Sequence, residues 1–320
     1  MTTQTQVNNE RTEEDSKSKR RLIPAFAIAT VFWAVGFLLW EISGYFEALL
    51  NFAYLGTSVG LGLGLYAVLP RKKKPQGRKL AQFLVGGYML LFMGVFISNN
   101  VQIEGFFFSF LSGIMGAAIT HYLMAKVLGP LLFGRLWCGW ACWTAMVLDL
   151  LPFTRSPGRV PGKIGYLRYT HFALSGIMVF FLWVLIGPWV GQDNSIVALL
   201  WVISGNIFYY AAAIGLAYKY KDNRAFCKVL CPITTLLKIT SRFSLIKVEG
   251  QAERCTECGA CEKVCPMDIK IREYLSKGKR VTSTECILCQ TCINSCPKKA
   301  LGLSIGFDIG WKELLRVREE

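Results

Sequence analysis

Three long stretches of this 320-residue chain lack lysine and arginine, although the chain carries a formal net charge of +15. They cover residues 22–70, 80–125 and 169–218. A basic face that binds nucleic acid must be open to water, whereas here the basic residues flank apolar segments, so we expect no nucleic-acid partner. Since 53% of the residues are hydrophobic, the composition indicates several membrane spans in contact with lipid.

Each of these stretches has 46 to 50 residues, which fits two spans of roughly 20 residues and a short turn. Three helical hairpins, and thus six transmembrane helices, are predicted. The turns carry Glu41, Glu47, Glu104 and Asp193, and we expect Glu41 and Glu104 to be solvated. The connections between hairpins are rich in lysine and arginine. The positive-inside rule therefore predicts a multi-pass protein of the cell's inner membrane with both termini in the cytoplasm.

The composition along the chain predicts three parts. Residues 1–21 are polar and charged, which indicates a flexible cytoplasmic tail rather than a signal peptide. Residues 22–240 form the expected membrane domain. Residues 241–320 are mixed in polarity and predict a separate cytoplasmic domain.

Histidine is scarce, and the two that occur are His121 and His171. A haem held by both would need them at one depth. His171 follows Arg168 by three residues, whereas His121 precedes Arg135 by fourteen, which separates their depths by more than about 10 Å. A shared haem is therefore not expected. His121 is a candidate for quinone binding or proton transfer, with a helix–helix hydrogen bond as the open alternative, and His171 is expected near the cysteine pairs described below.

Twelve cysteines are present, and eight of them form two identical patterns. The segments CTECGACEKVCP and CILCQTCINSCP both read C-x2-C-x2-C-x3-C-P, the run by which bacterial ferredoxins bind [4Fe-4S] clusters. In this pattern the fourth cysteine of each run serves the other cluster. One predicted ligand set is Cys255, Cys258, Cys261 and Cys296, and the other is Cys286, Cys289, Cys292 and Cys265. Structural zinc does not need eight cysteines in a repeated pattern, and disulfides are disfavoured in a reducing cytoplasm.

The four remaining cysteines also form a repeat. GRLWCGWAC and NRAFCKVLC each place an arginine three residues before the first cysteine, an aromatic residue directly before it, and a second cysteine four residues later. On a helix this spacing puts both sulfurs on one face, about 6 Å apart along the axis. Cys138, Cys142, Cys227 and Cys231 could then hold a third [4Fe-4S] cluster, whose charge Arg135 and Arg224 would balance. Separate thiol pairs or plain packing cysteines remain the alternatives.

These motifs together resemble those of membrane polyferredoxins of the NapH, MauN and NosR type. The resemblance covers about residues 80–301, although Trp143 stands where the first C-x3-C motif of the family has proline. It implies an integral-membrane electron carrier that works with quinone and with the subunits of a partner oxidoreductase. The large extracytoplasmic flavin domain of NosR-like members is absent from this sequence.

The fold expected is therefore an α-helical membrane protein with six transmembrane helices, followed by a cytoplasmic α+β ferredoxin domain of the bacterial two-cluster type. Its expected function is electron transfer between the quinone pool, or a membrane or extracytoplasmic partner, and the cytoplasmic clusters. Two other classes stay open, namely a maturation factor that reduces a metal ion for a partner enzyme and a redox-sensing scaffold.

Overall fold

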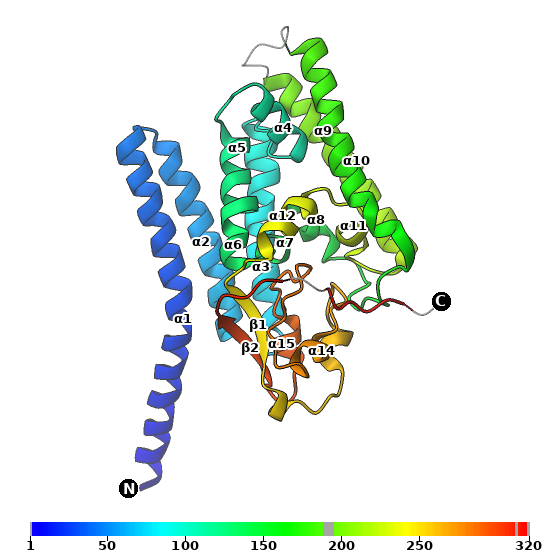
Figure 1. Cartoon of the computed structure of the whole chain (residues 1–320). Helices are drawn as coiled ribbons and strands as arrows, with labels where there is room; N and C mark the ends of the chain where they lie inside the picture. Colours follow the sequence, from blue (N-terminus) through cyan, green and yellow to red (C-terminus); the bar gives the residue numbers. More distant parts are fainter. Residues whose placement is uncertain (1, 188–194, 311–312, 319–320) are drawn as a thin grey trace. The chain divides into compact units, whose positions relative to one another are not determined.

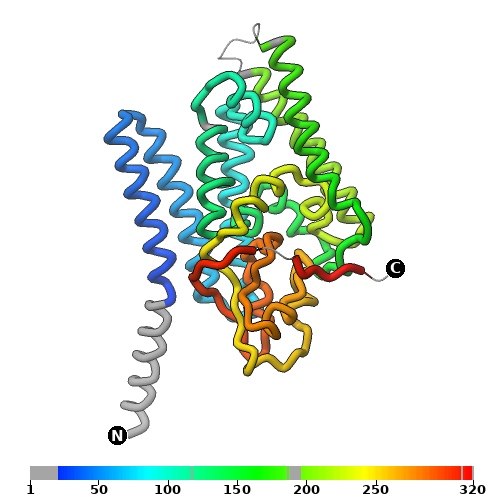
Figure 2. Tube along the Cα trace, in the orientation of Figure 1, coloured from blue at the N-terminus to red at the C-terminus, as the bar shows by residue number. Residues whose placement is uncertain are grey.

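The computed structural model is mainly helical and describes residues 2–187, 195–310 and 313–318 (Figures 1 and 2). The expected turn around Asp193 lies outside these residues. The chain divides into two compact units, Met1–Val85 and Gly86–Glu320. This division crosses the membrane part of the chain, so the predicted boundary between residues 240 and 241 remains a prediction.

The first unit contains a hairpin of two long helices, α1 (Thr2–Ser43) and α2 (Phe46–Val68). The helices approach closely because α2 carries small residues on the facing side. A Cβ atom added to Gly56 would lie only 2.5 Å from the Cβ atom of Phe32. Helix α1 includes the backbone of residues 2–20, whose side chains are not described. The predicted flexibility of the tail stays a prediction.

Five helices are long and apolar enough to cross a membrane within the described ranges. They are Arg21–Ser43, Phe46–Val68, Lys74–Phe96, Gly162–Leu185 and Ile196–Tyr220. The third joins α3 (Lys74–Gly87) to the π-helical η1 (Tyr88–Phe96), and the last two correspond to α9 (Leu167–Ile186) and α10 (Ser195–Tyr220). A shorter apolar helix, Ala118–Phe133, lies at the end of the stretch in which the fourth of the six spans was expected. It comprises α5 (Ala117–Tyr122), η2 (Leu123–Leu128) and α6 (Gly129–Phe133).

Residues 97–111 form a re-entrant segment in place of a simple turn. An added Cβ at Gly94 would lie 3.2 Å from Val202, whereas the side chain of Gln102 lies against Gly205, about 4.5 Å further along α10. The chain therefore turns back into the bundle after η1. Helix α4 (Ile103–Leu111) then runs along α9, and Trp183 Nε1 donates a hydrogen bond to Ser112 directly after it. Figure 1 shows α4 towards the end of α9 that is remote from β1 and β2.

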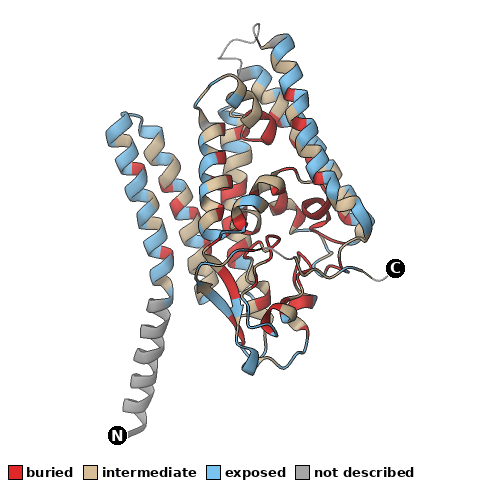
Figure 3. Ribbon diagram, in the orientation of Figure 1, coloured by how far each residue is buried: buried red, intermediate tan, exposed pale blue. Residues whose placement is uncertain are grey.

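Short helices connect the spans to the C-terminal domain. They are α7 (Leu136–Trp140), α8 (Trp143–Leu148), η3 (Gly162–Tyr166), α11 (Ala225–Val229) and α12 (Ile233–Ser241). All five residues of α11 are buried, and Figure 3 colours buried residues red. This is the region in which the two C-x3-C motifs lie.

The ferredoxin part is built on an antiparallel pair of strands, β1 (Ile246–Gly250) and β2 (Leu301–Ile305). Ile246 pairs with Ile305 and Gly250 with Leu301. Between the strands lie η4 (Ala252–Arg254), α13 (Ala260–Lys263), α14 (Ile271–Leu275) and α15 (Thr291–Ser295). The apolar core of this part includes several of its cysteines, so the loops that carry the thiols are themselves packed in place.

Candidate functional site

The first predicted ligand set surrounds one small cavity. Cys255, Cys258, Cys261 and Cys296 all line it, and its volume is about 20 Å³. The chain enters α13 through Gly259 at φ 71°, a conformation that glycine adopts without strain. Cys258 is exposed and Cys261 is buried. The exposed thiol therefore marks the side on which this cavity meets solvent.

The second predicted set surrounds another cavity. Cys286, Cys289, Cys292 and Cys265 line it, again around a volume of about 20 Å³. Its other walls are mainly apolar, with Val248, Met267 and Ile269 among them. Each cavity thus takes three cysteines from one run and the fourth from the other run. The clusters that these cavities would hold remain a prediction.

The two C-x3-C motifs have the same local backbone structure. Each has an arginine directly before a five-residue helix, α7 or α11, that contains the first cysteine. Each helix closes when the N–H of the second cysteine donates to the carbonyl of the aromatic residue before the first. These bonds join Cys142 to Trp137 and Cys231 to Phe226, both at 2.9 Å. The repeat seen in the sequence is therefore also a repeat of structure, and Trp143 does not alter it.

The prediction that each pair lies on one continuous helical face is wrong. Helix α7 ends at Trp140, before Cys142, and α11 ends at Val229, before Cys231. The hydrogen bond from the second cysteine spans five residues rather than four, which terminates the helix. Each motif is thus a short helix followed by a turn.

All four thiols of these motifs line one cavity. Cys138, Cys142, Cys227 and Cys231 surround a volume of about 60 Å³, together with polar residues from the membrane helices. Within the described ranges, no three His, Cys, Asp or Glu side chains meet closely enough to hold a single metal ion. The four thiols surround a cavity and do not converge on the position of one metal ion. The ligands of an iron–sulfur cluster are arranged in this way.

Two arginines bring positive charge to this cavity. Arg224 Nη1 donates to the carbonyl of Cys138 at 3.1 Å, and its Nη2 lies 2.7 Å from Oδ1 of Asp149. Arg135 lines the cavity and is fully buried, and its Nε and Nη2 atoms have no hydrogen-bond partner among the described residues. Buried donors without partners are costly, so they indicate a site for negative charge. A thiolate-bound iron–sulfur cluster fits this donor set.

The protonation of the thiols fits a site that a metal must complete. Burial raises the pKa of Cys227 to about 11, although Arg224 acts to lower it. Burial alone would lower the pKa of Arg135, but the carboxylate of Glu285 outweighs it, so the pKa is raised. The arginine stays charged, whereas the free thiol stays protonated at neutral pH. Binding of a metal would release the thiol protons.

The loop that carries the second ferredoxin set packs directly on the first C-x3-C motif. An added Cβ at Gly139 would lie 2.3 Å from the carbonyl oxygen of Ile287, so only glycine allows this approach. Trp140 Nε1 donates to the carbonyl of Leu288 at 3.0 Å, and both side chains are buried. Ile287 and Leu288 lie between Cys286 and Cys289 in the sequence. The second ferredoxin cavity is therefore the neighbour of the cavity lined by Cys138, Cys142, Cys227 and Cys231. These four are called the membrane-edge thiols below.

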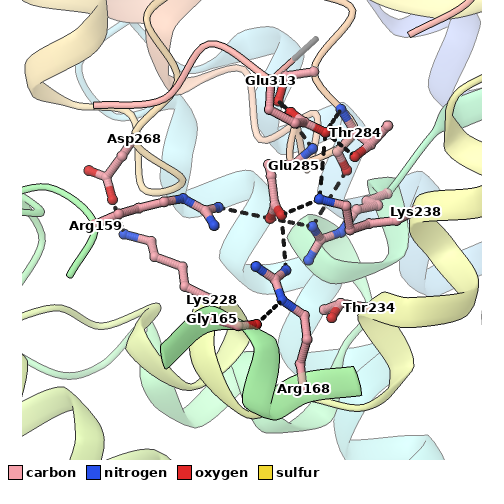
Figure 4. A network of polar contacts seen from close by, with 12 residues as sticks. Arg159, Gly165, Arg168, Lys228, Thr234, Lys238, Asp268, Thr284, Glu285 and Glu313 are labelled. Atoms are coloured by element: carbon pink, nitrogen blue, oxygen red, sulfur yellow. Dashed lines mark hydrogen bonds and ion pairs between the residues drawn. The ribbon is translucent and has the colours of Figure 1, made fainter. Parts of the chain in front are cut away.

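A buried carboxylate holds this contact together. Glu285, which precedes Cys286, is fully buried and has four cations around it. Their nitrogen atoms lie 2.7 to 2.9 Å from its oxygens and belong to Arg135, Arg159, Arg168 and Lys238. Figure 4 shows the last three side chains converging on Glu285. Burial by itself raises the pKa of Glu285, but these cations lower it well below its usual value.

A second group of charges joins the other motif to the ferredoxin. Lys228, next to Cys227, lies 2.5 Å from Oδ2 of Asp268 and 2.6 Å from Oδ2 of Asp222. Asp268 follows Cys265 by three residues and is fully buried. Both C-x3-C motifs are therefore linked by buried ions to segments that carry second-set ligands. These pairings over long sequence separations carried no signal in the sequence.

The two histidines have different positions. His121 lines the cavity of the four thiols, and its Nε2 has no hydrogen-bond partner among the described residues. His171 Nδ1 lies 2.9 Å from the carbonyl oxygen of Leu230, the residue before Cys231. His171 thus lies close to the second cysteine pair and supports its backbone. A role for either histidine with quinone remains a prediction.

The expectation that Glu104 is solvated is wrong. Its side chain is only 8% exposed, and Oε1 accepts hydrogen bonds from Tyr209 at 3.0 Å and from Ser175 at 3.2 Å. The re-entrant segment carries it into the bundle. Gln102 was not predicted as a site residue, although it is 2% exposed and lines the cavity of the four thiols. Gln102 and Glu104 form a polar pair within the apolar stretch 80–125, and this pair was the signal that could have indicated a functional role.

Comparison with known families agrees with the two kinds of cysteine motif. A family described as a 4Fe-4S dicluster domain matches residues 254–301, which include both ferredoxin runs. A family described as a 4Fe-4S binding domain matches residues 123–155 and 211–249, which include both C-x3-C motifs. No solved structure matches the chain.

Several known proteins are similar over most of the chain. The ferredoxin-type protein NapH of Haemophilus influenzae is 30% identical over 212 residues, which are 61% of this chain and 69% of that protein. The methylamine utilization ferredoxin-type protein MauN of Methylobacillus flagellatus is 26% identical over 194 residues, 58% of this chain and 68% of that protein. An uncharacterised protein of Methanocaldococcus jannaschii is 29% identical over 236 residues, 71% of this chain and 86% of that protein.

Proposed function

Because the chain belongs to the family of NapH and MauN ferredoxin-type proteins, we propose that it conducts electrons between membrane quinone and its own iron–sulfur clusters. It is a ferredoxin-type iron–sulfur protein of electron transport with apolar helices suited to a membrane. The observation that carries the proposal is the contact between the four membrane-edge thiols and the second ferredoxin set. That contact gives electrons a short route from the membrane to the ferredoxin part.

Three clusters would be held by the chain's twelve cysteines. The two ferredoxin sets would each hold one [4Fe-4S] cluster, and Cys138, Cys142, Cys227 and Cys231 would hold a third. When bound, each cluster supplies a reversible one-electron acceptor. Arg135 and Arg224 balance the charge of the third, and the buried Glu285 network keeps its neighbour in place. The protein itself need only position these groups and exclude water.

The packing supports an order in which electrons would pass between the three proposed clusters. The four-thiol cavity is next to the cavity of the second set, because Gly139 and Trp140 contact Ile287 and Leu288. The first set shares the ferredoxin core with the second, and its Cys258 is the exposed thiol. Electrons would thus pass from the membrane edge to the second set, then to the first, and leave at the surface around Cys258, where a partner oxidoreductase would dock.

The orientation follows from the charge pattern. The connections between hairpins are rich in lysine and arginine, so both termini and the ferredoxin part would face the cytoplasm of a cell whose inner membrane holds the helices. The route would then begin at quinone within the membrane and end on the cytoplasmic side.

Anaerobic reduction of the purified full-length protein by a quinol tests this function. We expect decylubiquinol or menadiol to reduce the clusters in the wild type, as seen by electron paramagnetic resonance. In Cys142→Ser, quinol should reduce none of the ferredoxin clusters, whereas dithionite should still reduce both. Cys258→Ala serves as the control, because it interrupts only the last step and leaves the two earlier clusters reducible by quinol. Reduction of the ferredoxin clusters at the wild-type rate in Cys142→Ser would refute the route.

A further inference from the structure

We propose that Gln102 and His121 form a binding site for the headgroup of a para-quinol, and that Glu104, behind Tyr209, accepts a proton from the quinol through the Tyr209 hydroxyl. The site rests on the proposed function, which supplies the electron acceptor. It assigns roles to two residues of the re-entrant segment, Gln102 and Glu104, that lie far in sequence from every cysteine.

The first support is a set of buried polar atoms that lack partners. Among the described residues, Gln102 Oε1 and Nε2, Glu104 Oε2 and His121 Nε2 make no hydrogen bond. Gln102 is 2% exposed and Glu104 8% exposed. Unpaired buried polar atoms destabilise a fold, so those of Gln102 and His121, which both line the cavity of the four thiols, indicate a ligand that pairs with them. The two oxygens of a para-quinol can accept and donate hydrogen bonds at opposite ends of the ring.

The second support is the shared cavity. Gln102, His121 and Tyr209 line the same cavity as the four thiols. Its volume of about 60 Å³ exceeds the space around either ferredoxin set. Trp137 and Trp143 complete apolar parts of its wall, which suits an aromatic ring. A headgroup bound there would be adjacent to the thiol-held electron acceptor.

The third support is the depth of the carboxylate. Glu104 accepts from Ser175, eight residues into α9, or about 12 Å from the start of that helix. A carboxylate at such depth in a span is costly and marks a functional site by default. The re-entrant segment places it there, within reach of Ser175 on α9 and Tyr209 on α10.

Tyr209 connects the carboxylate with the cavity. Its hydroxyl donates to Glu104 Oε1 at 3.0 Å, while the residue also lines the cavity. A quinol hydroxyl next to Tyr209 can therefore pass its proton to the tyrosine oxygen as the tyrosine proton moves to Glu104. The carboxylate is thus reached through one intervening hydroxyl.

Oxidation of one para-quinol to the quinone breaks two O–H bonds and releases two protons and two electrons. One proton passes through Tyr209 to the carboxylate of Glu104, and the other passes to Nε2 of His121. The electrons leave one at a time to a one-electron acceptor of the iron–sulfur class at the four thiols. Both proton acceptors must lose their protons before the next turnover.

The side-chain amide of Gln102 packs against Gly205, which has no side chain to displace it. An added Cβ at Gly205 would lie 2.7 Å from Gln102 Oε1 and 3.1 Å from its Nε2. The flexible end of the glutamine would have to move to admit it. Gly205→Ala therefore displaces the amide without changing any polar residue of the site.

Two measurements on the full-length protein in detergent test the site. The rate of cluster reduction by decylubiquinol should fall about 100-fold in Glu104→Gln and in Tyr209→Phe, as expected for loss of a positioned proton acceptor. Reduction by dithionite should not change, and Glu104→Asp should restore part of the quinol rate. Glu47→Gln, at the exposed start of α2, is the matched control and should behave as wild type. Wild-type quinol rates in both Glu104→Gln and Tyr209→Phe would overturn the role of Glu104.

Binding of oxidised decylubiquinone is measured separately by quenching of tryptophan fluorescence. Gln102→Leu and Gly205→Ala should each weaken it about tenfold, the loss of one good hydrogen bond, whereas the control Glu47→Gln should leave it unchanged. This measurement does not depend on electron flow. If neither quinol reduces the wild type, the proposed function fails, and unchanged binding in Gln102→Leu would still decide against the site itself.

Discussion

Arg135 Nη1 lies 2.7 Å from Glu285 Oε2, and both side chains are fully buried. One residue precedes the first membrane-edge cysteine by three positions, and the other directly precedes the first cysteine of the second ferredoxin run. The ion pair therefore joins two predicted ligand loops that are 150 residues apart in the sequence. Arg159, Arg168 and Lys238 form ion pairs with the same carboxylate. The negative charge of Glu285, in the ferredoxin part, is therefore neutralised by cations that all precede that part in the sequence.

Replacing Glu285 by glutamine should destabilise the protein strongly. The change leaves four cations, of which Arg135 and Arg168 are buried, with one neutral amide, and breaking a buried ion pair typically costs about 3 to 5 kcal/mol. We expect the free energy of unfolding, measured in denaturant, to fall by about 3 kcal/mol. Glu253→Gln, at an exposed position in η4, is the control and should change it little. Equal stability of both variants would contradict the role given to Glu285.

Gly139→Ala should separate the two ligand loops without removing any ligand. The new methyl group would meet the carbonyl of Ile287 at 2.3 Å, a backbone atom that cannot simply turn aside. We expect full iron content but slower passage of electrons from the membrane-edge site to the ferredoxin clusters, measured by rapid-freeze paramagnetic resonance. Gly215→Ala, where an added Cβ meets nothing within 4 Å, should show wild-type kinetics.

Iron and sulfide analysis should show how many clusters are bound. Three four-iron clusters give about 12 iron atoms per chain, and two give about eight. Cys142→Ser should lower the count by a third while the ferredoxin signals persist. Cys289→Ser should lower it by a similar amount but remove a ferredoxin signal instead. A wild-type value near eight in anaerobically prepared protein would mean that the four membrane-edge thiols hold no cluster.

Reporter fusions should place the termini on one side of the membrane. A reporter inserted at Gly44, in the exposed turn between α1 and α2, should behave as extracytoplasmic. Reporters at residue 320 and within the basic connection at residues 71–73 should behave as cytoplasmic. A cytoplasmic signal from Gly44 would reverse the first hairpin.

Asp308 should contribute to the stability of the ferredoxin part in a way that depends on pH. Burial raises its pKa, but hydrogen bonds from Lys247 and Arg280 outweigh this and lower it below the ordinary value of 3.8. A lowered pKa stabilises the fold above the unfolded value and loses that effect as pH falls through the folded value. The difference in unfolding free energy between wild type and Asp308→Asn should thus be constant from about pH 8 to pH 5 and shrink below it. A midpoint inside that range would show that the pKa is not lowered.

The positions of the thiols were largely predictable from the sequence. Cysteine spacing is a local property, and the exchange of Cys265 and Cys296 between the two sets follows from a known run. The structure places each of these predicted sets around one cavity. The shared surroundings of the C-x3-C motifs likewise indicated one site for both pairs, and all four thiols line one cavity.

The course of the chain around Glu104 was not predictable in the same way. Hydropathy averages over a window, so NNVQIEG resembles a turn between two spans whether it points to water or into the bundle. The same average cannot distinguish a full span from the shorter helix Ala118–Phe133. The cations around Glu285 come from four separate segments, and only the folded chain brings them together. The break of helix between Cys138 and Cys142 depends on one hydrogen bond, which spacing alone does not determine.

The contrast between Cys258 and Cys227 determines how the protein would fail in air. Cys258 is exposed, and a hydrogen bond from the backbone of Ala260 lowers its pKa, which favours the reactive thiolate. Cys227 is buried, and burial raises its pKa to about 11. Oxidants attack accessible thiolates first. Damage by oxygen would therefore begin at the ligand set that contains Cys258 and reach the membrane-edge thiols last. A briefly aerated sample would lose the cluster from which electrons leave, while the site that contains Cys227 would remain intact.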